Sequence, residues 1–261
     1  MHTIRNYIMA ESLEQAWELN QKGRNNIIIG GNLWLKMGRR NIINAIDLSS
    51  LGLDKIEEDE GGFRIGCMAT LHDIETHEGL NKEFQNLFKE AVRHIVGVQF
   101  RNCATIGGSI FPKLGFSDVL TAFLACDTQV ILYKKGEVPL REFIYIPTDN
   151  DILTHLYVKK DGRKTAYESF RMTETDFPTI TCAVAKTQDG IETVLGARPK
   201  HAEVVVDEVV ADAFSSEEVA DYAKRVIGKL QYGSNIRGSE QYRKQLSKVL
   251  IGRCISRLTE E

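Results

Sequence analysis

Two short glycine-paired stretches carry the residue types that this chain could use for chemistry. The first reads IGGNLW, from Ile29 to Trp34, and the second reads TIGGSI, from Thr105 to Ile110. Glycine leaves room for a ligand beside the backbone, and several N–H groups in succession bind a phosphate without help from a cation. Two such loops suit a diphosphate, although either loop taken alone is more simply a tight turn.

The second stretch also offers polar side chains. The hydroxyls of Thr105 and Ser109 are donors for phosphate oxygens, and Asp118 comes after them in a Ser-Asp pair. A diphosphate would repel a carboxylate, so we expect Asp118 to accept a hydrogen bond from a sugar or ribityl hydroxyl, to cap the helix beside it, or both. The G-x-G-x-x-G and G-x-x-x-x-G-K-[ST] fingerprints do not occur, which disfavours a Rossmann site and a P-loop.

The elements that would position these loops are indicated by hydrophobic periodicity. The first part alternates helices and strands, which places the first loop at the carboxyl end of a strand. The second part, from Thr165, favours antiparallel strands with a hairpin turn at 187–190, followed by two capped amphipathic helices. In chain order we expect helices at 12–22, 32–38, from Leu71, at 81–95, 117–125, 215–230 and 239–258, and strands at 25–29, 41–48, 61–67, 128–135, 151–160, 165–172 and 179–197.

Composition limits the classes of partner. The chain has 261 residues, 43% of them hydrophobic, which is enough for two domains or one large one. The formal net charge is −3 and no Lys/Arg stripe stands out, so we expect no nucleic-acid partner. No apolar run approaches the roughly 20 residues of a membrane span, and the start does not resemble a signal peptide, which predicts a cytoplasmic protein.

Cysteine and histidine patterns do not indicate a metal centre. The five cysteines include no C-x-x-C pair, and we expect each to be reduced and in or near the core. His72 and His77 are five residues apart, which favours surface or capping roles over ligation. No G-x-S-x-G elbow is present, so we expect no metal ligand and no catalytic residue on this chain.

Four motifs in order carry a resemblance to a known family. They are IIIGGNLWL, RNCATIGGSI with FSDVLTAFLACDTQVIL, AYESFRMTETDFPTITCAVA, and IRGSEQYRKQLSKVLIGR. The chain resembles the FAD-binding medium subunit of the molybdenum hydroxylases, the xanthine dehydrogenase and carbon monoxide dehydrogenase family. This implies an α+β fold: a two-subdomain FAD-binding domain of the vanillyl-alcohol oxidase type at 1–160, with subdomains at about 1–50 and 51–160, and a domain of antiparallel sheet with helices at 164–261.

The resemblance also implies a set of FAD-binding residues. Asp118 would hold a flavin hydroxyl, Ile95 would rest against the isoalloxazine ring, and Arg171 would supply positive charge near the ring. Phe100 and Phe111 could contact flavin, although core packing is the simpler expectation. The residues implied to contact the pyrophosphate are Gly30, Gly31, Asn32, Leu33, Trp34, Thr105, Gly107, Gly108 and Ser109, and Ile29 is a further cofactor-binding residue.

The implied function is electron transfer within a complex. A molybdenum-binding large subunit and an iron–sulfur small subunit would deliver electrons to FAD on this chain, and NAD or another acceptor would remove them. Departures from the family pattern leave alternatives open: Ser109 replaces the usual Asn, and FPKLG at 111–115 replaces a run of small residues. The alternatives are a self-contained flavin oxidoreductase of the same fold and a binding module without flavin.

Overall fold

The computed structural model describes residues 3–207 and 215–259, which form two compact units. Unit 1 contains residues 1–73, 98–112 and 128–158, and unit 2 contains residues 74–97, 113–127 and 159–261. Both units are therefore assembled from separate segments of the chain.

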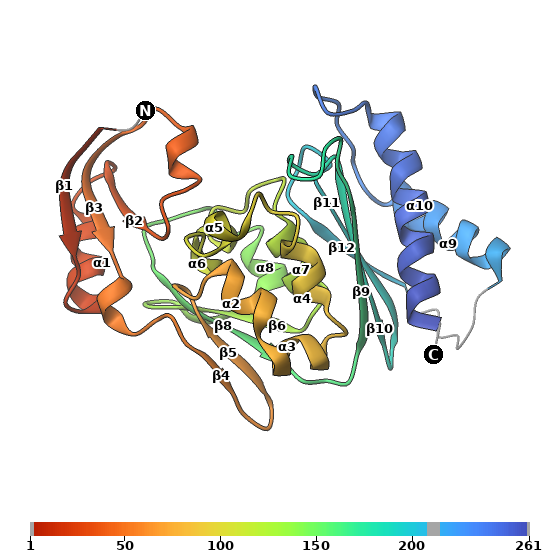
Figure 1. The fold of residues 1–261 in the computed structure, drawn as a ribbon, viewed down its shortest axis with the longest axis horizontal. Helices are drawn as coiled ribbons and strands as arrows, with labels where there is room; N and C mark the ends of the chain where they lie inside the picture. Colours follow the sequence, from red (N-terminus) through yellow and green to blue (C-terminus); the bar gives the residue numbers. More distant parts are fainter. Residues whose placement is uncertain (1–2, 208–214, 260–261) are drawn as a thin grey trace. The chain divides into compact units, whose positions relative to one another are not determined.

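Unit 1 begins with a parallel three-stranded sheet in the order β1-β3-β2 (Figure 1). Helix α1 packs on β2 and β3, and its amino end is capped by Ser12, whose side chain accepts a hydrogen bond from the N–H of Gln15. Ile29, Ile42 and Ala45 form an apolar cluster in this sheet. The elements are β1 (Thr3–Met9), α1 (Leu13–Gln21), β2 (Asn26–Ile29), η1 (Leu35–Met37), β3 (Asn41–Asp47) and η2 (Ser49–Leu51).

A five-stranded sheet in the order β4-β5-β8-β6-β7 forms the rest of unit 1, together with short helices. Thr70 caps α2 as expected, because its Oγ1 accepts a hydrogen bond from the N–H of Asp73 at 3.1 Å. The elements are β4 (Ile56–Glu58), β5 (Gly62–Gly66), α2 (Leu71–Thr76), α5 (Val98–Arg101), α6 (Ile106–Ile110), β6 (Thr128–Leu132), β7 (Gly136–Pro139), α8 (Leu140–Phe143) and β8 (Leu153–Lys159).

Unit 2 is built on an antiparallel four-stranded sheet in the order β12-β11-β10-β9 (Figure 1). The predicted hairpin at 187–190 joins β10 to β11, with Thr187 paired to Gly190. The elements are α3 (Glu78–Glu83), α4 (Leu87–Val92), α7 (Asp118–Leu124), β9 (Lys164–Phe170), β10 (Ile180–Thr187), β11 (Gly190–Gly196), β12 (Glu203–Asp207), α9 (Ser216–Gly228) and α10 (Glu240–Thr259).

Both faces of this sheet are covered. Ile180, Cys182 and Val184 of β10 belong to a core that includes residues of α9 and α10. The intervening Thr181 meets Thr121 of α7 on the other face, where α4 also packs on β9. Because side chains alternate between the faces of a strand, a strand covered on both sides is apolar along most of its length, as β10 is.

The α+β fold class and the C-terminal antiparallel sheet with helices are confirmed, but the single helix expected over 81–95 is wrong. The chain forms α3 and α4 instead, because Gln85 and Asn86 adopt left-handed backbone angles of 46° and 62° in φ. The break between α3 and α4 allows a contact with β9, because Thr165 donates from its N–H to Oε1 of Gln85 at 2.7 Å.

Strand β1 was not expected from the sequence. The domain boundary near residue 160 stays a prediction, since the two contact-defined units are each assembled from segments that alternate along the chain.

None of the helices within the described residues is both long enough and apolar enough to cross a membrane.

Candidate functional site

The first glycine loop, residues 29–34, comes directly after β2 in unit 1. It leaves the carboxyl end of a parallel strand, which is where open α/β sheets commonly place their ligands. Asn32 lies in the loop at a φ of 60°, a left-handed conformation that asparagine tolerates better than most residues. Residues 30–34 are partly exposed, so the loop is accessible to a ligand.

The first glycine loop presents a run of open hydrogen-bond donors. Within the described part of the chain, the N–H groups of Gly30, Gly31, Asn32 and Leu33 meet no acceptor. The Oδ1 atom of Asn32 is buried and likewise has no partner among the described residues. Successive open amides of this kind form a concave anion-binding surface, which is the feature that a diphosphate requires.

The second glycine loop, residues 105–109, differs because it forms the start of the short helix α6. Thr105 is the N-cap, and its Oγ1 accepts a hydrogen bond from the N–H of Gly108 at 3.2 Å. The N–H of Ile106 donates to the carbonyl of Ala69 at 2.9 Å, and that of Gly107 donates to the carbonyl of Cys67 at 2.8 Å. The backbone donors of this loop are therefore already bonded within unit 1.

Ser109 shows the same pattern. Its N–H donates to the carbonyl of Thr105 at 3.1 Å, and its hydroxyl donates to the same carbonyl at 3.0 Å. The side chain is buried, with 3% of the residue exposed. The hydroxyl of Ser109 thus stabilises the first turn of α6, and its predicted contact with a phosphate stays a prediction.

The two loops touch each other through the glycines of the first. A Cβ added to Gly31 would lie 1.5 Å from the carbonyl oxygen of Cys103, and one added to Gly30 would lie 2.1 Å from Oγ1 of Thr105. Real Cβ atoms do not approach other atoms this closely. The glycine pair is therefore required for the packing of the two loops in unit 1, in addition to any room that it leaves for a ligand.

Unit 2 contains three other expected site residues, Ile95, Asp118 and Arg171. A hydrogen bond joins Arg171 to Asp118. The Oδ1 atom of Asp118 accepts hydrogen bonds from Nη2 of Arg171 at 2.7 Å and from the hydroxyl of Tyr167 at 2.6 Å. Burial raises the pKa of Asp118, while the charge of Arg171 and the bond from Tyr167 oppose that rise. Burial and the Asp118 carboxylate raise the pKa of Tyr167, so the phenol keeps its proton.

Arg171 retains unused donors although its side chain is only 6% exposed. Its Nε and Nη1 atoms are buried and have no acceptor among the described residues. Burial, together with the charges of Arg93 and Arg171, lowers the pKa of the neighbouring His94, which favours the neutral imidazole. Ile95 is buried, with 8% of the residue exposed.

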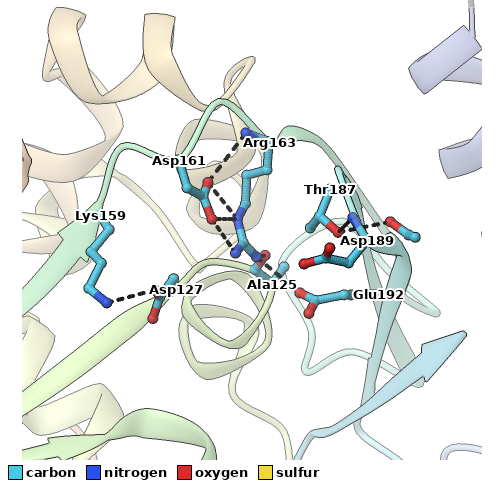
Figure 2. A network of polar contacts seen from close by, with 9 residues as sticks. Ala125, Asp127, Lys159, Asp161, Arg163, Thr187, Asp189 and Glu192 are labelled. Carbon is cyan, nitrogen blue, oxygen red and sulfur yellow. Dashed lines mark hydrogen bonds and ion pairs between the residues drawn. The ribbon is translucent and has the colours of Figure 1, made fainter. Parts of the chain in front are cut away.

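Helix α7 holds Asp118 in place because unit 2 anchors the helix at both ends. Figure 2 shows Arg163, which precedes β9, donating from Nη1 to the carbonyl of Ala125 at 2.6 Å, just after the last turn of α7. Asp161 and Glu192 contact the same guanidinium. A cation at the carboxyl end of a helix is favourable, and the pair of Asp118 with Arg171 at the other end completes the attachment to the segment containing β9.

Several other expected residues have structural roles. Trp34 packs edge-on against Phe100 at 5.2 Å between ring centroids, and Phe111 packs against Phe143 at 6.0 Å. His77 caps α3 as predicted. Each cysteine was expected to be reduced and in or near the core. All five are free and four are buried, but Cys103 is exposed, because it lies in the turn between α5 and the second glycine loop.

Tyr167 is a residue beside the candidate site that the sequence reasoning missed. It stands within the AYESFRM motif, four residues before Arg171, and side-chain alternation in β9 was the available signal that it faces α7. Across residues 3–207 and 215–259, no three His, Cys, Asp or Glu side chains gather into a metal-binding group.

The first glycine loop fits an FAD diphosphate. Its open amides are partly buried donors that the described chain leaves unsatisfied, whereas the buried Oδ1 of Asn32 is an acceptor that requires a donor such as a cofactor hydroxyl or a water. Such groups are destabilising unless a ligand or water meets them. The second glycine loop offers less, since its N–H groups from Ile106 to Ser109 are bonded internally.

The chain is similar to known proteins along nearly its whole length. The chain is 27% identical over 266 residues to the glyceraldehyde dehydrogenase medium chain of Sulfolobus acidocaldarius, covering 94% of each chain. It is 24% identical over 259 residues to the uncharacterized protein YgfM of Escherichia coli K12, covering 95% of this chain and 94% of the relative.

The fold has a close match among solved structures. A chain of carbon monoxide dehydrogenase from Hydrogenophaga pseudoflava, in a form lacking the Mo-pyranopterin moiety of the molybdenum cofactor, superimposes with a TM-score of 0.85. The match covers 96% of both chains at 22% identity. The family model described as the FAD binding domain in molybdopterin dehydrogenase matches residues 2–158. Because that match spans more than half of the chain, this protein belongs to the oxidoreductase family of FAD-binding subunits of molybdopterin dehydrogenases.

Proposed function

We propose that this chain passes electrons from iron–sulfur clusters on a small partner subunit to an acceptor such as NAD, within a complex whose large subunit holds the molybdenum cofactor. The proposal is supported by the family match and by the resemblance to a medium chain along nearly the whole length. When bound, FAD supplies redox chemistry that connects one-electron donors to a two-electron acceptor. The chain itself binds and orients the cofactor.

The observation that carries the proposal is the run of open amides in the first glycine loop. The N–H groups of residues 30–33 would hold the diphosphate, and the buried Oδ1 of Asn32 would accept a hydrogen bond from a cofactor hydroxyl or a water. Thr105 would contribute its hydroxyl proton, since its Oγ1 accepts from Gly108 and donates to no acceptor among the described residues. The remaining implied contacts of the second loop, Gly107, Gly108 and Ser109, would act mainly by supporting the first.

The resemblance assigns flavin contacts to residues of unit 2 as well. Arg171 would supply positive charge, which favours negative charge on a reduced ring. Asp118 holds that guanidinium in place. Because Tyr167 and Arg171 both donate to Oδ1 of Asp118, its Oδ2 is the atom that would accept a hydrogen bond from a flavin hydroxyl. Ile95 would supply apolar contact.

Purification of the chain tests the proposal. We expect a yellow protein with a flavin absorbance spectrum, or a colourless one that gains the spectrum when FAD is added. In its native host, the chain should purify together with two further chains that contain molybdenum and iron. A chain that stays colourless with added FAD overturns the proposal, and a chain that oxidises a substrate without partners indicates a self-contained flavin enzyme.

A further inference from the structure

The three-stranded sheet of unit 1 has an open edge that the flavin proposal does not use. Strand β1 is the outer strand of the order β1-β3-β2, and it pairs on one side only, with β3 (Figure 1). Helix α1 packs on β2 and β3, and every residue of β1 except Ile8 is exposed. The first glycine loop follows β2, so it lies at the opposite edge of the sheet.

Strand β1 lacks the features with which proteins usually protect a sheet edge. It contains no proline and no lysine, and its single charged residue, Arg5, forms no ion pair with a described residue. Three large apolar or aromatic side chains are exposed: Ile4 at 39%, Tyr7 at 57% and Met9 at 53%. A seven-residue edge of this kind is a template for pairing with a strand of another chain.

The pairing with β3 determines which backbone groups of β1 face outward. The N–H of Ala10, directly after the strand, donates to the carbonyl of Asp47 in β3 at 2.9 Å. Alternate residues of a parallel strand bond to the same neighbour, so the even-numbered residues of β1 bond to β3. Arg5, Tyr7 and Met9 therefore direct their N–H and C=O groups away from the sheet.

A ladder of asparagine side chains crosses the sheet and ends at the same edge. The Nδ2 atom of Asn6 donates to Oδ1 of Asn44 at 2.9 Å, and Nδ2 of Asn44 donates to Oδ1 of Asn26 at 3.0 Å. Asn6 is the last member, and its Oδ1 accepts no hydrogen bond from a described residue. Its amide also has a second hydrogen to donate. A strand that carries an asparagine at the facing position would extend the ladder.

We propose that β1 pairs antiparallel with β1 of a second copy of this chain, across a two-fold axis at Asn6. The two Asn6 side chains then face each other, and each amide donates to Oδ1 of the other. Arg5 faces Tyr7 of the second copy, whose ring is held in place by the hydrogen bond from its hydroxyl to Asp47 at 2.6 Å. A guanidinium over an aromatic ring is a favourable contact.

The other registers that use the same outward groups fit less well. An axis at Arg5 would place two like charges opposite each other, and an axis at Tyr7 would place Asn6 opposite Ile8. In the register centred on Asn6, Ile4 faces Ile8 instead, so apolar residues meet. The same edge is used by both copies, so the assembly closes as a dimer with a continuous six-stranded sheet.

The oligomeric state of the full chain tests the proposal. Seven-residue strands form a smaller contact than the standard interface of roughly 1,600 Å², so we expect a weak dimer that depends on protein concentration. Sedimentation velocity over a concentration series measures it. Asn6→Asp and Asn6→Lys each place like charges opposite each other, and each should raise the dimer dissociation constant about tenfold. An equimolar mixture of the two variants should recover the dimer, because aspartate then faces lysine.

A further variant leaves the asparagine ladder intact. Arg5→Glu removes the cation that faces Tyr7 and should also weaken the dimer, while circular dichroism should show an unchanged fold, since Arg5 is exposed. Asn25→Asp is the matched control, because Asn25 is exposed and directly precedes β2 at the other edge of the sheet. It should dimerise like the wild type.

Three results would overturn the proposal: a wild-type chain that stays monomeric over the whole series, a species larger than a dimer, or an Asn6→Asp and Asn6→Lys mixture that does not recover the dimer. A monomeric wild type whose assembly with partner chains is weakened by Asn6→Asp would show that the edge takes a strand of another subunit. Flavin absorbance is read on the same samples and should not differ between variants. Colourless protein that dimerises as expected counts against the proposed function alone.

Discussion

The two glycine loops share the tripeptide Ile-Gly-Gly and then a polar residue, yet they use their backbones in opposite ways. In the first, four successive N–H groups meet no described acceptor. In the second, the N–H groups from Ile106 to Ser109 are all bonded inside unit 1. The difference arises from the backbone conformation after the glycines: Asn32 turns the first loop at a φ of 60°, whereas the second loop enters α6 at once.

The comparison shows that paired glycines mark places where another group packs closely against the backbone. Whether that group is a ligand or part of the protein is known only from the structure. Gly31 lies against the carbonyl of Cys103, and Gly107 lies against Cys67. In both cases the near atoms belong to the protein. The first loop therefore combines packing with open donors, whereas the second serves packing and capping.

Gly31→Ala gives the largest expected effect. The new Cβ would lie 1.5 Å from a backbone oxygen, so the two loops must separate. We expect the free energy of unfolding to fall by about 3 kcal/mol, the upper end for overpacking, and FAD to be lost. Urea unfolding and flavin absorbance measure the two effects. Gly23→Ala is the matched control, since a Cβ there meets nothing within 4 Å. Stable, flavin-loaded Gly31→Ala protein would show that the loops do not depend on this contact.

Gly107→Ala should reduce stability while leaving FAD affinity close to the wild-type value. Its Cβ would lie 2.9 Å from the Cβ and carbonyl oxygen of Cys67, which predicts a loss of about 1–2 kcal/mol in the free energy of unfolding. FAD titration of the folded variant supplies the second measurement. Gly108→Ala, whose Cβ meets only Oγ1 of Thr105 at 3.1 Å, should be milder. If Gly107→Ala abolished FAD binding in folded protein, the second loop would have a direct binding role.

Asn32→Gly separates backbone from side chain in the first loop. Glycine accepts the φ of 60°, so we expect the stability of the FAD-free chain to change by less than about 0.5 kcal/mol. The FAD dissociation constant should rise about tenfold, because a polar partner is lost. Quenching of flavin fluorescence measures the constant. Asn32→Asp keeps the shape and adds a negative charge, so it should bind FAD still more weakly; wild-type affinity in the Asn32→Asp variant would exclude a nearby phosphate.

Thr105→Val gives the smallest effect and tests the cap of α6. It preserves the branched shape but removes the acceptor for the N–H of Gly108, which predicts a loss of about 1 kcal/mol in the free energy of unfolding. Thr105→Ser keeps the hydroxyl and should retain most of that energy. Chemical denaturation of the three proteins measures the difference, and equal stability of the valine variant would show that the 3.2 Å bond contributes little.

The elements with local signals were predictable from sequence. Helix α9 is capped as expected, with Ser215 and Glu218 forming a capping box, and the 187–190 hairpin forms as the turn residues indicate. The helix expected over 81–95 fails because the left-handed turn at Gln85 and Asn86 is stabilised by Thr165, which is distant in sequence. Helical periodicity continues through the break and does not reveal it.

The candidate site was predictable in part for the same reason. Both glycine loops were identified, because their residue types are local signals. The carbonyl groups of Cys67 and Ala69 accept hydrogen bonds from the second loop, and a side chain of β9 donates to Asp118. These partners are distant in sequence, so they could not be predicted from neighbouring residues. Hydrogen-bond satisfaction depends on tertiary contacts, which composition and spacing do not specify.

The interleaved construction of unit 2 limits how this protein could be recombined with its relatives. A fragment that begins near residue 164 would lack α4 and α7, and the face of the sheet bearing Thr165, Tyr167 and Thr181 would be left open to water. A hybrid with its crossover in the linker before β9 would pair a sheet from one parent with covering helices from the other. The transferable module is thus three pieces of chain, at 74–97, 113–127 and from 159 onward, which must be exchanged together.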